Sequence, residues 1–191
     1  DVVESAQDTG ARRVVVVDNG STDSTSLKAK EAGAVVVSEP IRGYGQACLT
    51  GIASLTADPP DWVLFCDGDG ADDPHGLARV IKAAHTGEVD FVIGNRANRN
   101  SEAGALTIPQ RFGNRLACGL IRVLYQTRFK DLGPLRMIRW STLCNLKMQD
   151  KAFGWTVEMQ VKAAKQRVSF CEVDVKARCR RGGKSKISGT V

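Results

Sequence analysis

The chain has 191 residues, 42% of them hydrophobic and 25% charged, and a net charge of +6 at pH 7. This length and composition predict a domain with a buried core and exclude a wholly disordered chain. No apolar run approaches the roughly 20 residues of a spanning helix, so no bilayer-crossing segment is expected, whereas the modest positive charge fits an anionic substrate, a membrane surface or nucleic acid.

The six cysteines show no metal-ligand spacing, and two of them, Cys66 and Cys171, lie in apolar, strand-like runs. Disulfides are rare in the reducing cytosol, where buried cysteines behave as small apolar residues. We therefore expect a cytoplasmic protein with reduced thiols.

In the first half of the chain, short apolar runs alternate with segments of helical spacing. Strands are predicted at Arg13–Val17, Ala34–Val37, Trp62–Cys66 and Asp90–Ile93, and helices at Ser24–Ala32, Gly45–Ala57 and, after the N-cap Asp73, from Pro74 to His85. This alternation is typical of an α/β sheet with right-handed crossovers. Because continuous runs such as RVVVV occur in strands buried on both faces, we expect a mostly parallel sheet.

The second half is predicted to contain longer helices and fewer strands. It begins with an amphipathic helix at Pro109–Tyr125, which has Leu116, Leu120 and Leu124 on one face. This helix is followed by a short strand at Leu135–Ile138, a helix at Trp155–Lys165, a strand at Val168–Val175 and a glycine-rich basic tail at Arg178–Lys186.

The chain opens with helical residues, Val2–Gln7, that lead directly into the first predicted strand. An α/β domain usually begins with a strand. We therefore expect the parent protein to contain an earlier strand that is absent from this sequence, and we expect residues 1–191 to form a single domain.

The strongest local signal is FCDGDGADD, residues 65–73, in which an apolar strand ends in two carboxylates, Asp67 and Asp69. Ligands of open α/β sheets bind at the carboxyl ends of strands. Neighbouring carboxylates repel each other unless a cation compensates, and Mg²⁺ or Mn²⁺ prefers oxygen ligands and bridges to phosphates. The segment predicts a divalent metal site, and a solvated turn before the next helix is the alternative.

The spacing of this segment also bears on two other kinds of site. A calcium loop needs further ligands where Ala71 and Ala78 stand, so the spacing excludes it. A phosphatase of the haloacid-dehalogenase type has Asp-x-Asp-Gly with the first Asp, here Asp67, as nucleophile. That motif normally follows the first strand, whereas two predicted strands precede it here, so the phosphatase is a weaker alternative.

Two further polar segments follow predicted strands. In VVDNGSTD, Asp18 and Asn19 are suited to hydrogen-bond a nucleobase or ribose, although a capped turn explains the segment equally well. In RGYGQA, Arg42 and Gly43 lead into a helix, and backbone N–H groups at such a place approach anions. Tight-turn packing is the alternative for this second segment.

Taken in chain order, VVDNGSTD, RGYGQA and DGDGADD all follow predicted strands, and in this order they resemble the family 2 glycosyltransferases with a GT-A fold. The resemblance covers nearly the whole chain and continues through Ile93–Arg96, Gln110–Asn114, Asp131–Arg136 and Arg180–Lys186, the last being similar to the Arg-x-x-Gly-x-Ser-Lys signature of the dolichyl-phosphate mannosyltransferase-like branch. It implies an α/β nucleotide-diphospho-sugar transferase fold with a single Rossmann-like, mostly parallel sheet flanked by helices. The family's first strand, which ends in Pro-x-x-Asn-Glu, is missing here.

The resemblance implies transfer of a sugar, with inversion, from a nucleotide diphosphate donor of the UDP-glucose or GDP-mannose type. Residues 1–95 would bind this donor with Mg²⁺ or Mn²⁺, and residues 96–191 would bind the acceptor. Asp69 is expected to bind the metal directly, and Asp67 to contact the ribose or share the metal through water. The other donor-binding residues are expected to be Asp18, Asn19, Arg42, Gly43 and Gly68. Ala71 stands where much of this branch has a Gln or Glu that assists the metal.

The acceptor implied by the resemblance is a polyprenyl or dolichyl phosphate, which is already an anion and needs little general-base help. Its phosphate is expected to contact Arg96, Arg111, Arg136, Arg180, Lys184, Ser185 and Lys186. A small acceptor with a neutral hydroxyl would need a carboxylate base, for which Asp131 and Glu158 are the candidates. Trp155 is either a sugar-stacking residue or a core residue.

The expected partners are therefore a nucleotide-sugar donor and a lipid-phosphate or small acceptor, without nucleic acid. A non-catalytic nucleic-acid binder would also fit a net charge of +6, but the paired carboxylates would repel phosphates in the absence of a metal. The basic tail favours anionic lipid, so peripheral association with the cytoplasmic membrane face is also predicted. The pattern favours no particular oligomeric state.

Overall fold

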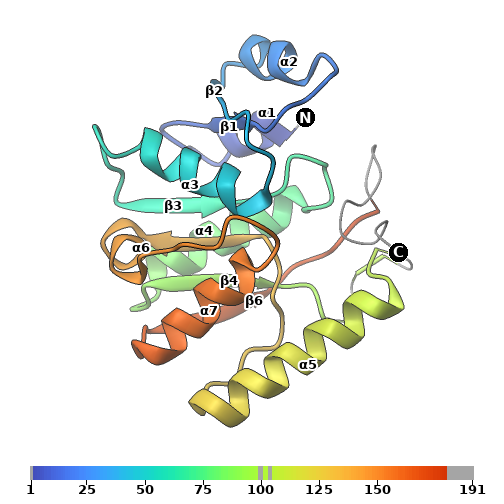
Figure 1. Ribbon diagram of the computed structural model, residues 1–191, viewed down its shortest axis with the longest axis vertical. Helices are drawn as coiled ribbons and strands as arrows, with labels where there is room; N and C mark the ends of the chain where they lie inside the picture. The colour runs from blue at the N-terminus through green and yellow to red at the C-terminus, as the bar shows by residue number, and fades with distance from the viewer. Residues whose placement is uncertain (1, 99–100, 103–104, 180–191) are drawn as a thin grey trace.

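A computed structural model describes residues 2–98, 101–102 and 105–179 of the chain (Figure 1). In chain order, the elements are α1 (Val2–Gln7), β1 (Val15–Asp18), α2 (Thr25–Glu31), β2 (Val35–Ser38), α3 (Tyr44–Ser54), β3 (Trp62–Phe65), α4 (Pro74–Thr86), β4 (Phe91–Asn95), α5 (Ile108–Tyr125), β5 (Arg136–Arg139), α6 (Trp140–Leu146), α7 (Trp155–Lys165) and β6 (Phe170–Asp174). Every predicted strand and helix is present, and α6 is an addition.

The described strands form two sheets. β1 pairs in parallel with β2, and the other strands lie in the order β3-β5-β4-β6. β5 is antiparallel to both of its neighbours, whereas β4 and β6 are parallel. β3, β4 and β6 therefore run in one direction, and their carboxyl ends meet at one edge. Among the described strands no ladder joins β1 to β3, so the single continuous sheet that we predicted is divided at this point.

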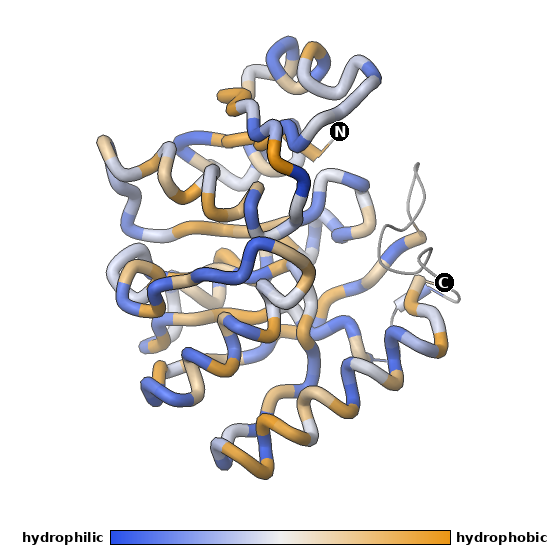
Figure 2. Tube along the Cα trace, in the orientation of Figure 1, coloured by the Kyte–Doolittle hydropathy of each residue, from blue (hydrophilic) through white to orange (hydrophobic). Residues whose placement is uncertain are grey.

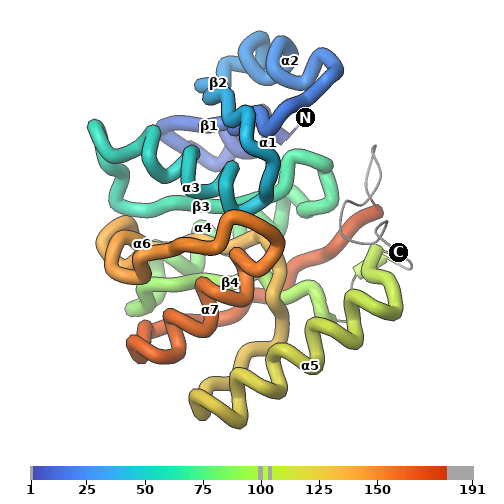
Figure 3. Tube along the Cα trace, viewed as in Figure 1, coloured from blue at the N-terminus to red at the C-terminus, as the bar shows by residue number. Residues whose placement is uncertain are grey.

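Helices cover both faces of the four-stranded sheet, as Figures 1 and 3 show. Successive side chains of a strand point to opposite faces, and β4 shows this clearly. Phe91 and Ile93 pack in the larger core with residues of α5, α6 and α7, against which α3 also packs. Val92, between them, packs in a second core with Leu77 and Val80 of α4. All three β4 side chains are fully buried, which explains the uninterrupted apolar run.

Local sequence explains where several elements begin and end. α5 begins with a capping box, in which Thr107 and Gln110 each bond the other's backbone N–H, and with a proline in its first turn. α4 likewise has Pro74 at its start. Gly33, after α2, has a φ of 85°, which glycine adopts without the steric penalty of a side chain.

The amphipathic helix predicted in the second half is α5, and the side of it that faces the core is not the side that carries its leucines. Leu116, Leu120 and Leu124 of α5 are 53%, 52% and 68% exposed. The buried side of α5 instead carries Cys118 and Ile121, which join the core beside α7. The helix and its period were predicted correctly, but the leucine-bearing face is directed to solvent.

Within the described residues, no helix is both long enough and apolar enough to span a membrane. All six cysteines lie in the described part of the chain, and none of them is joined to another in a disulfide. Burial raises the pKa of the Cys66 thiol to about 12 and that of Cys48 to about 12. These two thiols are therefore poor nucleophiles at neutral pH.

Candidate active site

Most of the predicted site residues line one large cavity, with a volume of about 2360 Å³, at the carboxyl ends of the strands. The facing edges of β1 and β3 and the first turns of α5 also border it. The predicted residues that line the cavity are Asn19, Arg42, Gly43, Asp67, Gly68, Asp69, Arg96, Arg111 and Asp131. The fold therefore brings residues from both halves of the chain around one space. Asp18, Arg136 and Glu158 are not among its lining residues.

Asp18 and Asn19, at the end of β1, hold the neighbouring loops in place. The Asp18 carboxylate accepts a hydrogen bond from the Ser26 hydroxyl and another, 2.9 Å long, from the Ser21 N–H, and these bonds hold the pKa of Asp18 below its ordinary value. The Asn19 amide donates to the carbonyls of Glu39 and Ile41, at 2.9 and 2.7 Å. The polar side chains predicted to bind a base or ribose thus have intramolecular partners in the structure.

The loop that carries Arg42 and Gly43 is fixed from both sides. The Gly43 N–H donates to the Asn19 side-chain oxygen at 2.8 Å. The Glu39 carboxylate accepts hydrogen bonds from the backbone of Ile41, from Gln46 and from Thr50, and the bond from Thr50 is the main cause of its lowered pKa. Arg42 itself is exposed and lines the cavity, so a guanidinium is presented there on a well-supported loop.

The acidic segment after β3 forms a compact turn. Asp69 accepts a 2.9 Å hydrogen bond from the Ala71 N–H, and Asp72 accepts a 3.2 Å bond from the Asp67 N–H. Burial, together with the nearby Asp67 charge, raises the pKa of Asp72 to about 6. The neighbouring carboxylates repel each other, and a bound cation would offset that repulsion.

The residues present fit a divalent metal that is shared with a substrate. Among the described residues, no three Asp, Glu, His or Cys side chains lie close enough together to form a metal-binding group. Asp67 and Asp69 nevertheless both line the cavity. Their carboxylate oxygens, combined with phosphate oxygens from a donor, are the ligand type that Mg²⁺ and Mn²⁺ prefer.

Asp73 forms an ion pair with Arg178 and not the hydrogen bond to the first turn of α4 that its N-cap position predicts. It is the N-cap residue of α4, but its side chain makes no capping hydrogen bond. Asp73 is buried, with 4% of the residue exposed, and its carboxylate instead pairs with the Arg178 guanidinium at 2.5 Å. The Arg178 N–H also donates to the Ala71 carbonyl at 2.9 Å. The segment after β6 thus holds the acidic turn in place, a contact that sequence analysis missed.

Arg96 and Asp131, predicted as a phosphate ligand and a candidate base, are paired with each other. The Arg96 Nε and Nη2 lie 2.9 and 3.1 Å from the two Asp131 oxygens, and the Arg96 N–H donates to Asp131 at 2.7 Å. Asp131 is 1% exposed. Both of its oxygens are therefore occupied, which does not suit a general base, whereas Arg96 is 21% exposed on its side chain and borders the cavity.

Arg136 is buried beneath the site, which contradicts its predicted contact with an acceptor phosphate. It is 0% exposed, and its guanidinium donates to the carbonyls of Gly133 and Thr156. Burial lowers the pKa of Arg136 to about 10. Tyr44, whose pKa is raised by burial and then by the Asp67 charge, lies in the same buried region. Tyr44 was not predicted, because nothing in RGYGQA distinguishes it from a packing residue.

Glu158, the other candidate base, organises a loop. It accepts hydrogen bonds from the N–H groups of Gln149 and Asp150, at 2.9 and 2.8 Å, and pairs with Lys162 at 2.7 Å. Partial burial raises the pKa of Glu158, but the bonds from Lys162 and the two N–H groups outweigh this and lower it overall. The next residues of this loop accept hydrogen bonds from the N–H groups of Gly45 and Gln46, so Glu158 supports the start of α3.

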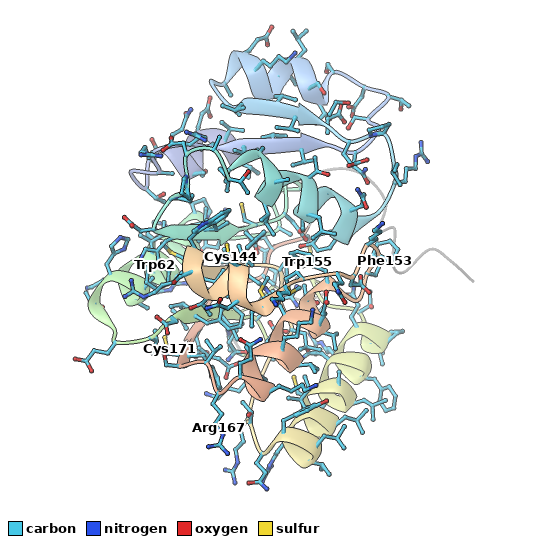
Figure 4. All side chains as sticks on the ribbon, turned by 60° about the vertical axis from the view of Figure 1, so that its left-hand side comes forward. Trp62, Cys144, Phe153, Trp155, Arg167 and Cys171 are labelled. Atoms are coloured by element: carbon cyan, nitrogen blue, oxygen red, sulfur yellow. The ribbon has the colours of Figure 1, made fainter. Side chains whose placement is uncertain are left out.

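The remaining predictions differ in outcome. Trp155 is a core residue, 1% exposed, with its ring 6.2 Å from that of Phe65, and Figure 4 shows it in the interior. Arg111 is exposed on α5 and lines the cavity. The predicted phosphate ligands Arg180, Lys184, Ser185 and Lys186 lie outside the described residues.

Solved structures share this fold. Glucosyl-3-phosphoglycerate synthase from Mycobacterium tuberculosis, in complex with phosphoglyceric acid, superposes with a TM-score of 0.73 at 21% identity, over 98% of this chain and 68% of that chain. The same enzyme in complex with Mn²⁺, UDP and glucosyl-3-phosphoglycerate gives a TM-score of 0.69 at 22% identity, with the same two coverages. These likenesses define a GT-A-like α/β fold, as the sequence resemblance predicted.

The sequence comparisons identify the family. Glycosyl transferase family 2 matches residues 2–152. An uncharacterized glycosyltransferase of Mycobacterium tuberculosis strain H37Rv is 34% identical over 181 residues, which are 94% of this chain and 79% of that protein. Glycosyltransferase AglJ of Haloferax volcanii is 32% identical over 167 residues, 87% of this chain and 54% of that protein. The chain belongs to glycosyl transferase family 2 and is a glycosyltransferase, which replaces the phosphatase alternative.

Proposed function

We propose that this enzyme transfers a sugar from a nucleotide diphosphate donor to a phosphate-bearing acceptor, with inversion at the anomeric carbon and with Mg²⁺ or Mn²⁺. The observation that carries the proposal is the position of Asp67 and Asp69, which follow β3 and line the same cavity as Arg42 and Arg111. Glucosyl-3-phosphoglycerate synthase, which shares the fold, has been solved with Mn²⁺ and UDP-glucose, and this supports the donor class and the metal.

Residues 1–95 supply the donor side of the proposed reaction. Asp69 would hold the cation directly, and Asp67 would hold it through water or contact the ribose. When bound there, the cation supplies positive charge to the nucleoside diphosphate leaving group. Arg42 would face the same negative charge from the opposite loop, whose position is fixed by the hydrogen bond from the Gly43 N–H to Asn19.

The acceptor side, residues 96–191, favours a nucleophile that is already an anion. In the reaction, an acceptor phosphate oxygen bonds to the anomeric carbon while that carbon's bond to the donor diphosphate breaks, and no proton has to be removed. The two candidate bases are both engaged, Asp131 by Arg96 and Glu158 by Lys162 and two backbone N–H groups. This favours the lipid-phosphate acceptor of the dolichyl-phosphate mannosyltransferase-like branch.

A small acceptor is the second candidate. Glucosyl-3-phosphoglycerate synthase has been solved with phosphoglyceric acid, an acid that carries both a phosphate and a hydroxyl. Arg111, exposed at the cavity, suits either kind of phosphate because a guanidinium pairs with phosphate through two parallel hydrogen bonds.

Thermal-shift measurements against UDP- and GDP-sugars, each with and without Mn²⁺, test the donor proposal. We expect a rise in the midpoint temperature with one nucleotide sugar that depends on the metal, since a ligand that binds only the folded state stabilises it. The acceptor is then tested by turnover of that donor with a short-chain polyprenyl phosphate, with phosphoglycerate and with the corresponding prenyl alcohol. Transfer to the alcohol but to neither phosphate would contradict the proposed acceptor class.

A further inference from the structure

The outward side of α5 is an exposed apolar surface, which we call the α5 face. It consists of Ile108, Phe112, Leu116, Leu120, Val123 and Leu124, whose exposures range from 52% to 84%. Figure 2 shows this helix with apolar positions along its length, at the periphery of the molecule. Monomeric soluble proteins rarely leave so many large apolar side chains exposed on one continuous surface, and such surfaces usually contact a partner.

The α5 face is not a by-product of packing. Phe112 and Ile121 are nine positions apart in the helix, and at about 100° per residue this places them on opposite sides. Ile121 is 3% exposed and packs in the core, where α5 meets α7. The helix therefore has one apolar side for the core and a second apolar side that nothing in the described structure covers.

A row of arginines borders the α5 face. Arg111, Arg115 and Arg122 lie on the flank between the exposed and buried sides, and all three are exposed. The helix contains no Asp or Glu, and within the described residues none of these three arginines forms an ion pair. A large apolar side flanked by uncompensated arginines is the pattern of helices that lie in the interface of an anionic bilayer.

We propose that the α5 face docks on an anionic membrane surface, with its apolar side chains among the lipids and its arginines at the headgroups. Charge complementarity favours lipid over a second copy of the chain. An antiparallel contact between two α5 faces would set the arginine rows side by side, and like charges at close range are unfavourable. The proposal rests on α5 alone and is independent of the basic tail, most of which lies outside the described residues.

The position of the α5 face relative to the active site agrees with this orientation. Ile108, Arg111 and Phe112, in the first turns of α5, also line the cavity. A bilayer seated on α5 would therefore lie at the border of the cavity, where a membrane-anchored acceptor could present its phosphate. This last consequence depends on the proposed function, whereas membrane binding by α5 does not.

Co-sedimentation with vesicles tests the proposal directly. We expect the full chain to bind vesicles of equal parts phosphatidylglycerol and phosphatidylcholine, and to bind pure phosphatidylcholine vesicles at least about tenfold more weakly, with a loss of binding at high salt. The variant Leu116→Gln/Leu120→Gln/Leu124→Gln removes three exposed side chains that do not line the cavity, and its binding should fall by about tenfold or more. The matched control Leu27→Gln/Val35→Thr removes exposed apolar side chains elsewhere and should bind as the wild type does.

Two further measurements, hydrogen exchange and sedimentation equilibrium, test the α5 face independently of vesicle binding by the variant. Hydrogen exchange of the wild-type protein should slow at residues 108–124 when anionic vesicles are added, which requires no variant. Sedimentation equilibrium without lipid should give a monomer for both wild type and variant. Unchanged vesicle binding by the leucine variant, no vesicle binding by the wild type, or a wild-type dimer that the variant dissociates would each overturn the proposal. Donor binding, measured separately by thermal shift, tests the proposed function whichever of these results is found.

Discussion

Arg96 and Asp131 form an ion pair with two hydrogen bonds, 2.9 and 3.1 Å long, at the wall of the cavity. A third bond, from the Arg96 N–H to the same carboxylate, measures 2.7 Å. The pair joins the loop after β4 to the loop before β5. Because Asp131 is 1% exposed, we assign it to the support of the site and not to proton transfer.

The Asp131→Asn variant tests this assignment. It leaves a partly buried guanidinium without its counter-charge, and loss of one partner of a buried pair costs about 3–5 kcal/mol. We expect the free energy of unfolding, measured with urea, to fall by about 3 kcal/mol, at the lower end of that range because Asn keeps an acceptor. A variant that is as stable as the wild type but no longer turns over would indicate a catalytic base instead.

The exposed pair between Arg139 and Asp90 is the matched control. Its side chains are 44% and 42% exposed, and the shortest contact is 2.7 Å. Solvent-exposed pairs contribute little to stability, so Asp90→Asn should cost at most about 1 kcal/mol.

The close approach of α3 to the loop supported by Glu158 predicts a strong effect at a glycine. A Cβ at Gly45 would overlap the Asp150 carbonyl oxygen, and the Gly45 N–H already donates to the Ala152 carbonyl at 2.9 Å. We expect Gly45→Ala to lower the free energy of unfolding by about 1–3 kcal/mol, as overpacking does, and to weaken donor binding because the loop of Arg42 shifts.

Gly119→Ala is the control for this substitution. Gly119 lies on the exposed part of α5 with nothing within 4 Å of a Cβ, so the change should stabilise the protein by about 0.5–1 kcal/mol through helix propensity. Equal effects of the two alanines, measured by urea unfolding, would contradict the packing described at α3.

Glu39 predicts a specific pH dependence of stability. The hydrogen bond from Thr50, followed by those from Gln46 and the Ile41 N–H, lowers the pKa of this carboxylate in the folded state. A group with a lowered folded pKa contributes stability above its unfolded pKa, about 4.3, and loses that contribution as the pH falls through the folded value. As the pH falls, the wild type should therefore lose the stability that the Glu39 charge contributes, whereas Glu39→Gln has no such contribution to lose.

The measurement is urea unfolding of both proteins from pH 7 down to pH 3. The difference in stability between wild type and Glu39→Gln should be largest near neutral pH and shrink below about pH 4. A difference that stays constant over this range would show that the Glu39 charge is not stabilised by the fold.

The sequence predicted the strands, the order of the elements and the acidic turn, because these follow from local patterns. The run WVLFC before Asp67 is long enough and apolar enough to identify a buried strand, and Asp-x-Asp at its end identifies a place for ligands. The glycosyltransferase resemblance rests on such segments, and the family was confirmed.

What the sequence did not predict depends on contacts between distant residues. The partner of Asp73 is Arg178, 105 positions away. The local pattern at an N-cap does not predict an ion pair with so distant a residue. In the sequence, Arg136 cannot be distinguished from an exposed arginine that binds phosphate, because its burial depends on the fold. Likewise, the period of α5 identifies an amphipathic helix, but it cannot tell which of two apolar sides meets the core.

The central claim is that Asp69 holds a divalent cation that binds the donor, and calorimetry tests it most directly. The nucleotide sugar identified by thermal shift is titrated into wild-type protein, Asp69→Ala and the control Glu31→Ala, whose side chain is exposed on α2, each with Mn²⁺ and with chelator. We predict Mn²⁺-dependent binding by the wild type and the control, and none by Asp69→Ala. Undiminished, metal-dependent binding of the nucleotide sugar by Asp69→Ala would contradict the account.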